Sequence, residues 1–276
     1  MKSKFNKHIL EAVHKGIQLA LDDYEDNDLN SNIRSKDEII KNDEEILHHI
    51  IDVIDLGLPS GTLWAKYNIG VNPTKLNKWE DWQGKYFAWG EIEEKEVYNW
   101  STYKWGGDEH AMKLSDYILK YAGFQDKELE LCDDAAYMNT RGKYITPTAE
   151  QFSELLKNCN IEYIHPALKG YGYNQIVTYD GHELFTDGYM FTSKINEKKL
   201  FFPCSDIKSD NDVTEQNLHL NDTCNALYWT RSLYDSGSGH KLTQAFHAFY
   251  SHGDMHKYVS VFDRSAGLPI RPVLNK

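Results

Sequence analysis

The segment Asp55–Gly70 constrains the fold of this 276-residue chain more than any other stretch. It reads as a short apolar strand, a Pro-Ser-Gly turn and a second strand that contains Leu63 and Trp64. It holds no general base, no thiol and no phosphate-binding loop. The segment therefore predicts local β-structure and no chemistry of its own.

From Asp55 onward, short aromatic and β-branched runs are separated by Gly, Asn, Asp and Pro. Two stretches are helical in pattern: Glu128–Asn139, and Thr148–Cys159 with a capping box of Thr148 and Gln151. Strands and helices do not alternate regularly, so the pattern indicates an α+β fold rather than a doubly wound parallel sheet. The predicted strands are Tyr86–Trp89, Tyr189–Thr192, Leu200–Pro203, Ala226–Leu233, Ala245–Ser251, Tyr258–Phe262 and Pro269–Leu274.

Residues 1–54 differ from the rest of the chain. Apolar residues recur every four positions from Phe5 to Leu21, and a second helix is predicted to begin at a capping box of Ser35 and Glu38. The apolar residues of this second helix repeat every seven positions, so the helix can either form a short coiled coil or pack on the domain that follows. We therefore expect a helical oligomerisation or anchoring segment over 1–54 and one domain over 55–276. The expected oligomerisation residues are Ile39, Ile46, Ile50 and Val53.

The formal net charge of -12 argues against a nucleic-acid partner and against docking on an anionic membrane. The basic start of the chain is followed by Glu11, His14 and Lys15, so it lacks the apolar run of a common export signal. The four cysteines are far apart, and without an export signal buried free thiols are favoured over disulfides. We expect a soluble protein with no zinc site.

Several separate runs follow one another along the chain: Asp55–Gly70, Tyr86–Glu91, Tyr98–Lys104, Asp133–Ala136, Thr146–Phe152, Glu154–Leu156, Phe201–Pro203, Tyr228–Leu233, Arg264–Gly267 and Ile270–Val273. In this order they resemble the Fibrobacter succinogenes major paralogous domain family of Bacteroidetes proteins and their phages. That resemblance implies a C-type-lectin-like fold of the formylglycine-generating-enzyme type, similar to the variable proteins of diversity-generating retroelements, which bind ligands with one face. One departure is Tyr144-Ile-Thr-Pro-Thr148, where the family commonly has Trp-Arg-Met-Pro-Thr.

Other constellations are better explained by structure than by chemistry. Trp64, Trp89 and Trp100 lie inside matched runs and are expected in the core rather than in a sugar-stacking platform. His252 and His256 flank Gly253 in a predicted loop, so a zinc site is disfavoured, and the Asp-rich stretches lack the spacing of a calcium loop. No nucleophile motif, P-loop or dinucleotide fingerprint is present, so we expect no enzyme activity and no cofactor.

The expected ligand surface is a polar, aromatic region near the C-terminus. Period-two alternation predicts Leu227, Trp229 and Leu233 inward, with Tyr228, Thr230 and Ser232 outward. Tyr, Ser, Asp and Gly in the following loops are typical of a loop paratope, and in the retroelement relatives this section contacts ligand. Ordinary solvated loops are the alternative. The candidate ligand-binding residues are Tyr228, Arg231, Ser232, Tyr234, Asp235, Ser236, Ser238, His240, Tyr250, His252, Asp254, His256 and Tyr258.

These observations predict a non-enzymatic binding or display module. The absence of an export signal, together with the resemblance, points to a phage virion protein that is made in the host cytoplasm and binds a host-surface glycan or protein. The N-terminal helices would then contact other virion proteins or further copies of the chain. The alternatives are a bacterial surface adhesin, an enzyme of the formylglycine-generating type, and a purely architectural virion protein.

Overall fold

The computed structural model describes residues 53–104, 128–166, 176–205, 207–209, 224–233, 242–251 and 254–275. The chain divides between Leu47 and His48 into two units, and all described residues belong to the second. The predicted N-terminal helices, with Ile39, Ile46 and Ile50, lie outside the described residues. In the described part of the chain, no helix has the length and hydrophobicity that a membrane span requires.

A four-stranded sheet joins the beginning and the end of the described unit, in the order β1-β2-β14-β4. Its pairings are antiparallel, and Ile54 of β1 lies opposite Trp64 of β2. The predicted helical stripe does not reach Val53, because Val53 pairs with Ala65 in this sheet. The strands are β1 (Val53–Asp55), β2 (Leu63–Ala65), β4 (Tyr144–Ile145) and β14 (Val273–Leu274).

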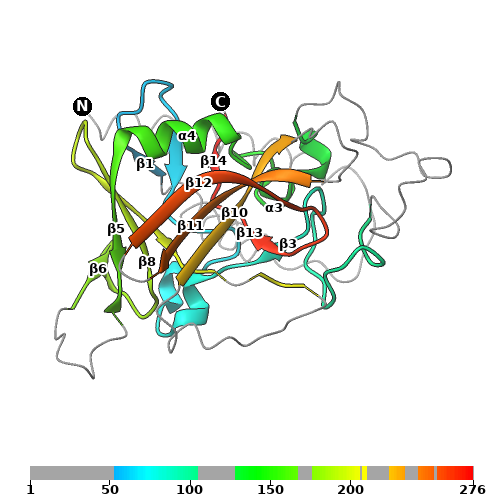
Figure 1. Ribbon diagram of the computed structural model, residues 1–276, viewed down its shortest axis with the longest axis horizontal. Coiled ribbons are helices and arrows are strands. Elements are labelled where there is room, and N and C mark those ends of the chain that lie inside the picture. The colour runs from blue at the N-terminus through cyan, green and yellow to red at the C-terminus, as the bar shows by residue number, and fades with distance from the viewer. Residues whose placement is uncertain are drawn as a thin grey trace, which may run out of the picture. The chain divides into compact units, whose positions relative to one another are not determined.

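Two three-stranded antiparallel sheets and two strand pairs complete the β-structure (Figure 1). The predicted strands that begin at Tyr189, Leu200, Ala226, Ala245 and Tyr258 each lie within an observed strand. The three-stranded sheets are β5 (Cys159–Ile164), β8 (Gly188–Ser193) and β9 (Lys199–Pro203), and β10 (Cys224–Leu233), β11 (Leu242–Ser251) and β12 (Asp254–Asp263). The pairs are β3 (Tyr86–Phe87) with β13 (Leu268–Pro269), and β6 (Thr178–Tyr179) with β7 (His182–Glu183).

The predicted strand Pro269–Leu274 is two short strands, β13 and β14, separated by the segment that holds Arg271. The arrangement is mixed and mostly β, with few helices and antiparallel sheets, which agrees with the α+β expectation at the coarse level. The described helices are η1 (Pro73–Lys75), η2 (Trp79–Trp82), η3 (Leu131–Asp133), α3 (Ala135–Asn139) and α4 (Ala149–Asn158).

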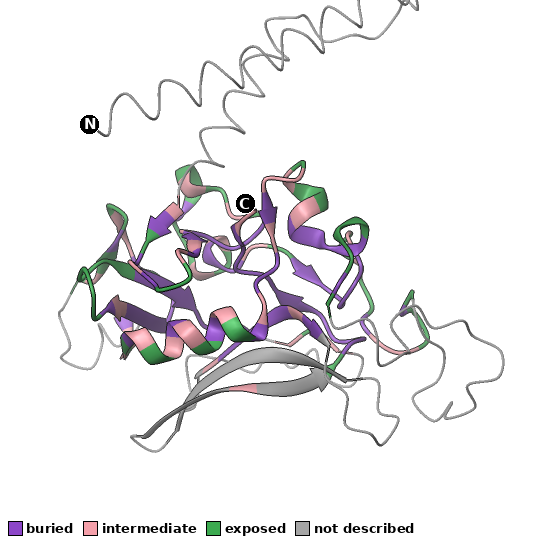
Figure 2. Cartoon of the chain, turned by 90° about the horizontal axis from the view of Figure 1, so that it is seen from above, coloured by how far each residue is buried: buried purple, intermediate pink, exposed green. Residues whose placement is uncertain are grey.

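Helix α4 forms as its sequence predicts. The Thr148 side chain accepts from the Gln151 amide, and the Gln151 side chain accepts from the Thr148 amide, so the capping box is confirmed. Phe152 and Leu155 are buried, and Figure 2 shows buried and exposed residues on opposite sides of this helix. Burial of this apolar stripe against the sheets stabilises a helix too short to persist alone.

The predicted helix Glu128–Asn139 forms only in part, because Asp134 divides it into the short helices η3 and α3. Asp134 has an extended backbone, and its carboxylate accepts from the amides of Ala136 and Tyr137 as the N-cap of α3. The same carboxylate accepts from the amide and hydroxyl of Thr146, the hydroxyl at 2.7 Å. A side chain that serves four donors fixes where the helix begins, so the residues before it form the separate turn η3.

Two large apolar clusters fill the unit. The first, which we call the α4 core, contains Trp64, Phe152, Phe202 and Tyr228, and the rings of Phe202 and Tyr228 meet edge to face at 5.0 Å. The second, the tryptophan core, contains Trp89 and Trp229 together with residues of α3 and β13. Core positions are therefore confirmed for Trp64 and Trp89, whereas Trp100 is only half-buried and packs on Tyr103.

Arg271 is fully buried between β2 and the α4 core. Its Nε donates to Asn68 Oδ1 at 2.8 Å, its Nη1 donates to the Lys66 carbonyl at 2.6 Å, and its guanidinium lies 4.8 Å from the centre of the Phe202 ring. Burial lowers the pKa of Arg271. The residue thus ties the C-terminal segment to Lys66 and Asn68, which follow β2 within the Asp55–Gly70 segment.

The cysteines only partly follow the expectation of buried free thiols. Cys159 is a buried free thiol, Cys132 is free but exposed, and Cys204 is disulfide-bonded. The prediction is therefore confirmed for Cys159 and wrong for Cys132 and Cys204. Spacing along the sequence could not reveal the disulfide, because bonded cysteines need only be close in the fold.

Candidate binding surface

Strand β10 carries three candidate residues, and the structure uses them internally. Tyr228 is fully buried, and its hydroxyl donates to the Pro203 carbonyl at 2.7 Å. Thr230 and Ser232 are also buried, so the predicted outward positions are wrong. The reason is that β10 lies between both cores: Tyr228 faces the α4 core while Leu227 and Trp229 face the tryptophan core. A strand covered on both sides has no solvent face to alternate toward.

Arg231 and Ser232 hold neighbouring chain segments in place. Arg231 donates from Nη2 to the Leu129 carbonyl at 2.5 Å and pairs with Glu128 at 3.4 Å. The Ser232 hydroxyl accepts from the Ala149 amide at 3.0 Å, which satisfies one of the free amides at the start of α4. Arg231 and Ser232 therefore have a structural role in the scaffold.

The remaining candidates fall on the hairpin β11–β12 or outside the described residues. Tyr234, Asp235, Ser236, Ser238, His240 and His252 lie outside the described residues. The others do not form a loop as predicted, because β11 and β12 pair along their whole length with Ser251 opposite Asp254. Phe249 lies opposite His256, and His247 lies opposite Tyr258. Tyr250 pairs with Met255 instead.

The hairpin register divides the candidates between the two faces of the sheet. Val259 is partly buried against the α4 core, and α4 packs against β10, β11 and β12. Because strand residues alternate, the odd-numbered positions of β12 share the face of Val259, whereas Asp254, His256 and Tyr258 share the face of Leu227, which belongs to the tryptophan core. Tyr250 belongs to the face of Val259 by its pairing with Met255. The structure therefore brings three of the candidates together on one face.

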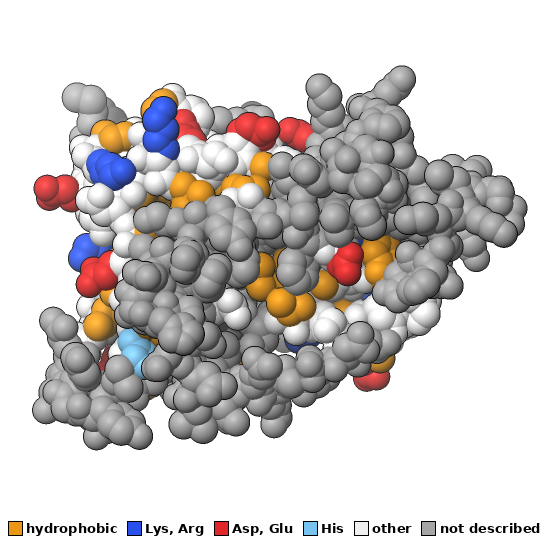
Figure 3. All heavy atoms as spheres, viewed as in Figure 1, with side chains coloured by type: hydrophobic (Ala, Val, Ile, Leu, Met, Phe, Trp, Pro, Cys, Tyr) orange, Lys and Arg blue, Asp and Glu red, His pale blue; other side chains and the backbone are white. Residues whose placement is uncertain are grey.

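Figure 1 shows the β10–β11–β12 sheet as a separate layer with α4 beside it. The space-filling view from the same side shows acidic and basic side chains along the upper border, in the region of α4, whose exposed residues include Glu150 and Lys157 (Figure 3). The border of this surface is thus of mixed charge despite the net negative charge of the chain.

Sequence reasoning missed a histidine–aspartate pair beside the start of β8. His165 Nδ1 lies 2.5 Å from Asp187 Oδ2, and the Tyr163 hydroxyl donates to the same oxygen at 3.0 Å. Asp187 is buried, whereas the His165 side chain is 25% exposed. A buried carboxylate on Nδ1 fixes the imidazole orientation and turns Nε2 away from it. The two residues are 22 positions apart, so no local pattern could have indicated them.

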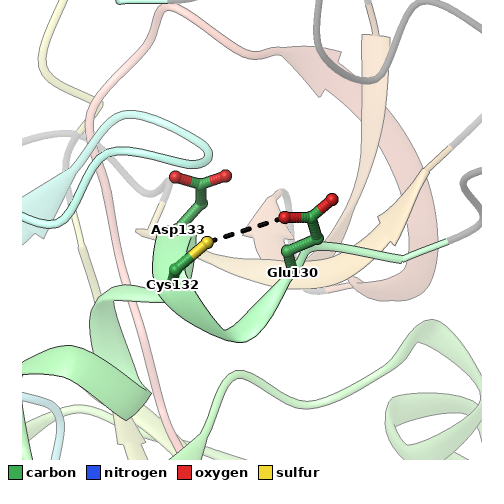
Figure 4. A group of neighbouring side chains, drawn as sticks. All are labelled: Glu130, Cys132 and Asp133. Carbon is green, nitrogen blue, oxygen red and sulfur yellow. Dashed lines mark hydrogen bonds between the residues drawn. The ribbon is translucent and has the colours of Figure 1, made fainter.

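A second group missed by sequence reasoning is Glu130, the N-cap of η3, with Cys132 and Asp133 of η3 (Figure 4). Their ligand atoms lie within 4.8 Å of one another, and Cys132 Sγ lies 3.6 Å from Glu130 Oε2. Thiolate and carboxylate ligands of this kind can hold a divalent ion. Asp133, however, already lies 3.5 Å from the Lys104 ammonium, so its charge is balanced by a protein cation.

A cavity lies in the tryptophan core between Trp89 and Trp229, with Leu129 and Thr146 also in its wall. Its volume of about 10 Å³ suits at most one water molecule rather than a substrate. Comparison of the chain with protein-family models, curated proteins and solved structures finds no significant match in any of the three.

Proposed function

We propose that the chain is a non-enzymatic binding module displayed on a phage virion, with a host-surface glycan or protein as its ligand. The finer fold in this proposal is the C-type-lectin-like fold that the resemblance to the Fibrobacter succinogenes major paralogous domain implies. Residues 1–54 would join the module to other virion proteins or to further copies of the chain. The ligand would bind to the face of the sheet that carries the even-numbered residues of β12.

The observation that carries the proposal is the attachment of the hairpin to a rigid strand. Trp229 and Tyr228 of β10 are buried. The Tyr228 hydroxyl and the Trp229 indole nitrogen each donate a hydrogen bond to a backbone carbonyl at 2.7 Å. A binding surface built on such a strand loses little conformational freedom when a ligand docks. The hairpin itself brings Tyr258, His256 and Asp254 to one face, a mixture of aromatic and polar groups that suits recognition.

The buried positions of the matched runs also support this proposal. Trp64 in the opening motif, Trp89, Asp134, Phe202 and Arg271 each come from a different run, and all five are buried. Runs spread over more than two hundred residues of sequence thus contribute to shared packing, as expected if together they specify one scaffold.

The disulfide at Cys204 bears on location. Disulfides persist where thiols are not kept reduced, which suits a protein that acts outside the cytoplasm. This favours a particle or cell surface, and it also keeps the bacterial adhesin of the same fold as a second candidate. The identity of the flanking genes would separate the two, because capsid or tail genes would favour the virion and surface-export genes the adhesin.

Binding can be tested with the full chain on an array of bacterial surface glycans and on intact host cells. The informative change is Tyr258→Ala with His256→Ala, and the matched control is Ile195→Ala, an exposed apolar residue between β8 and β9. The double variant should lose at least about tenfold in affinity, the effect of a residue group at the centre of an interface. Equal affinity of all three proteins would refute the hairpin as the binding surface.

The enzyme alternative has its own test. Enzymes of the formylglycine-generating type depend on reactive cysteines, and Cys132 is an exposed free thiol in the described part of the chain. Cys132→Ser should leave ligand binding unchanged if the module is not an enzyme. A cysteine-dependent oxidation of a peptide substrate that disappears in this variant would overturn the proposal.

A further inference from the structure

Strand β12 lies at the edge of its sheet, in the order β10-β11-β12. All ten of its residues pair with β11 without a register shift. In the part of the chain that the structure describes, no strand pairs with its other side. Strand β10 differs, because its register shifts between Trp229 and Leu233 and its other side is bonded by the amides of Ser205 and Leu129.

Proteins usually protect an exposed edge with a proline, a bulge, a very short strand, a covering element or a charged side chain such as lysine, because unpaired amides and carbonyls recruit other strands. Of these, the sequence of β12 carries one lysine, Lys257. From Asp254 to Asp263 there is no proline, no glycine and no bulge. The centre of the strand, Tyr258–Phe262, is instead rich in the aromatic and β-branched residues that favour strand pairing. This edge therefore has the features of a pairing edge.

We propose that β12 pairs with β12 of a second copy of this chain, antiparallel about a two-fold axis through Ser260. In that register Lys257 of each copy lies opposite Asp263 of the other, so opposite charges meet at both ends. Tyr258 lies opposite Phe262 and Val259 opposite Val261, which are favourable cross-strand pairs. The two three-stranded sheets become one continuous sheet.

Electrostatic repulsion favours this register over the alternative in which the two β12 strands overlap along their whole length. Full overlap of the two strands would place Asp254 of one copy opposite Asp263 of the other, and like charges directly opposite each other are destabilising. Centring on Ser260 removes that clash and replaces it with two Lys–Asp pairs. The pairing is isologous, as expected for a two-fold dimer.

The dimer goes beyond the proposed function and does not depend on it. Strand pairing alone buries a small area, so the association of two isolated copies is expected to be weak. On a particle that holds many copies, however, the pairing would place two hairpin faces side by side and raise their effective concentration toward a ligand.

Disulfide trapping tests the register in the full chain. In a Cys132→Ser background, Ser260→Cys places one thiol directly opposite its counterpart, at a separation that a disulfide can bridge. The matched control, Lys257→Cys, lies about 20 Å from its own counterpart in this register, since strands rise about 3.3 Å per residue. After mild oxidation, Ser260→Cys should give a covalent dimer on a non-reducing gel, and Lys257→Cys should not.

Charge exchange in the Ser260→Cys background gives a second readout that does not depend on assembly through residues 1–54. Lys257→Asp should slow the formation of the disulfide, and Lys257→Asp with Asp263→Lys should restore it. Far-ultraviolet circular dichroism checks that each variant folds like the parent. Equal trapping of Ser260→Cys and Lys257→Cys, no trapping at all, or a rate unaffected by charge reversal would each overturn the proposal.

Discussion

Trp89 and Trp229 tie the same two chain segments together in opposite directions. The Trp89 indole donates to the Thr230 carbonyl at 2.8 Å, and the Trp229 indole donates to the Phe87 carbonyl at 2.7 Å. Both rings are buried in the tryptophan core. These two bonds connect residues more than 140 positions apart, so they fix β10 relative to β3.

Trp229→Phe should test that connection. Phenylalanine fills most of the ring site but leaves the buried Phe87 carbonyl without the indole donor, so we expect a loss of about 1–3 kcal/mol in the free energy of unfolding. Urea unfolding followed by circular dichroism measures it. Trp79→Phe, at a half-buried residue of η2, is the control and should cost less. Equal losses at the two positions would contradict the assigned role of the bond.

Arg271 and Asn68 should prove energetically coupled. Arg271→Met leaves Asn68 Oδ1 and the Lys66 carbonyl without this donor, and we expect a loss of about 2–4 kcal/mol in the free energy of unfolding. Asn68→Ala removes one acceptor. Because the two residues share a hydrogen bond, the double variant should lose less than the sum of the single variants. Strict additivity in the double-mutant cycle would show that the bond does not contribute.

Alkaline pH should destabilise the unit through buried phenols. Burial raises the pKa of Tyr98 and of Tyr228 to about 12, whereas an unfolded tyrosine titrates near 10. The folded state therefore holds these protons more tightly than the unfolded state. The contribution of these two phenols to the free energy of unfolding is full below about pH 10 and is lost as the pH rises toward 12.

Spectroscopic titration of phenolate absorbance measures this effect. Tyr98 and Tyr228 should ionise only together with unfolding. Tyr228→Phe removes one of these groups and should reduce the dependence of the free energy of unfolding on pH above 10. Ionisation of every tyrosine near its ordinary pKa in the folded protein would be the contrary result.

The free cysteines should differ sharply in reactivity. Burial raises the pKa of the Cys159 thiol to about 11, so at neutral pH it carries little of the reactive thiolate and is also shielded from reagents. Cys132 is exposed. Iodoacetamide followed by peptide mass spectrometry should label Cys132 in the folded protein and Cys159 only after denaturation. Labelling of Cys159 at the rate of Cys132 would show that it is not buried.

Local signals in the sequence predicted α4 and most of the longer strands correctly. The capping box at Thr148 depends on residues three positions apart, and the strands depend on nearest-neighbour patterns, so both are visible without tertiary structure. The break at Asp134 was missed because its carboxylate is also engaged by Thr146, twelve residues away. Val53 was missed because a seven-residue repeat continued by chance into a short strand.

The candidate site was harder to predict because it too depends on residues that are distant in the sequence. Alternation along β10 predicted an outer face, but the second core that covers this strand is built from distant residues such as Trp89 and Leu129. Gly253 suggested a loop, whereas strand pairing extends from Ser251 to Asp254 on either side of it. The His165–Asp187 pair is likewise a product of the fold.

The position of β14 has a consequence for synthesis on the ribosome. Val273 pairs with Trp64 on one side and with Ile145 on the other, so β2 and β4 have no direct partner in each other. The four-stranded sheet therefore cannot form completely until the segment around Val273 has emerged from the ribosomal exit tunnel. A product terminated prematurely before that point would keep β2 paired with β1 but would leave β4, and the edge of β2 that faces β14, without a strand partner and open to proteases and chaperones.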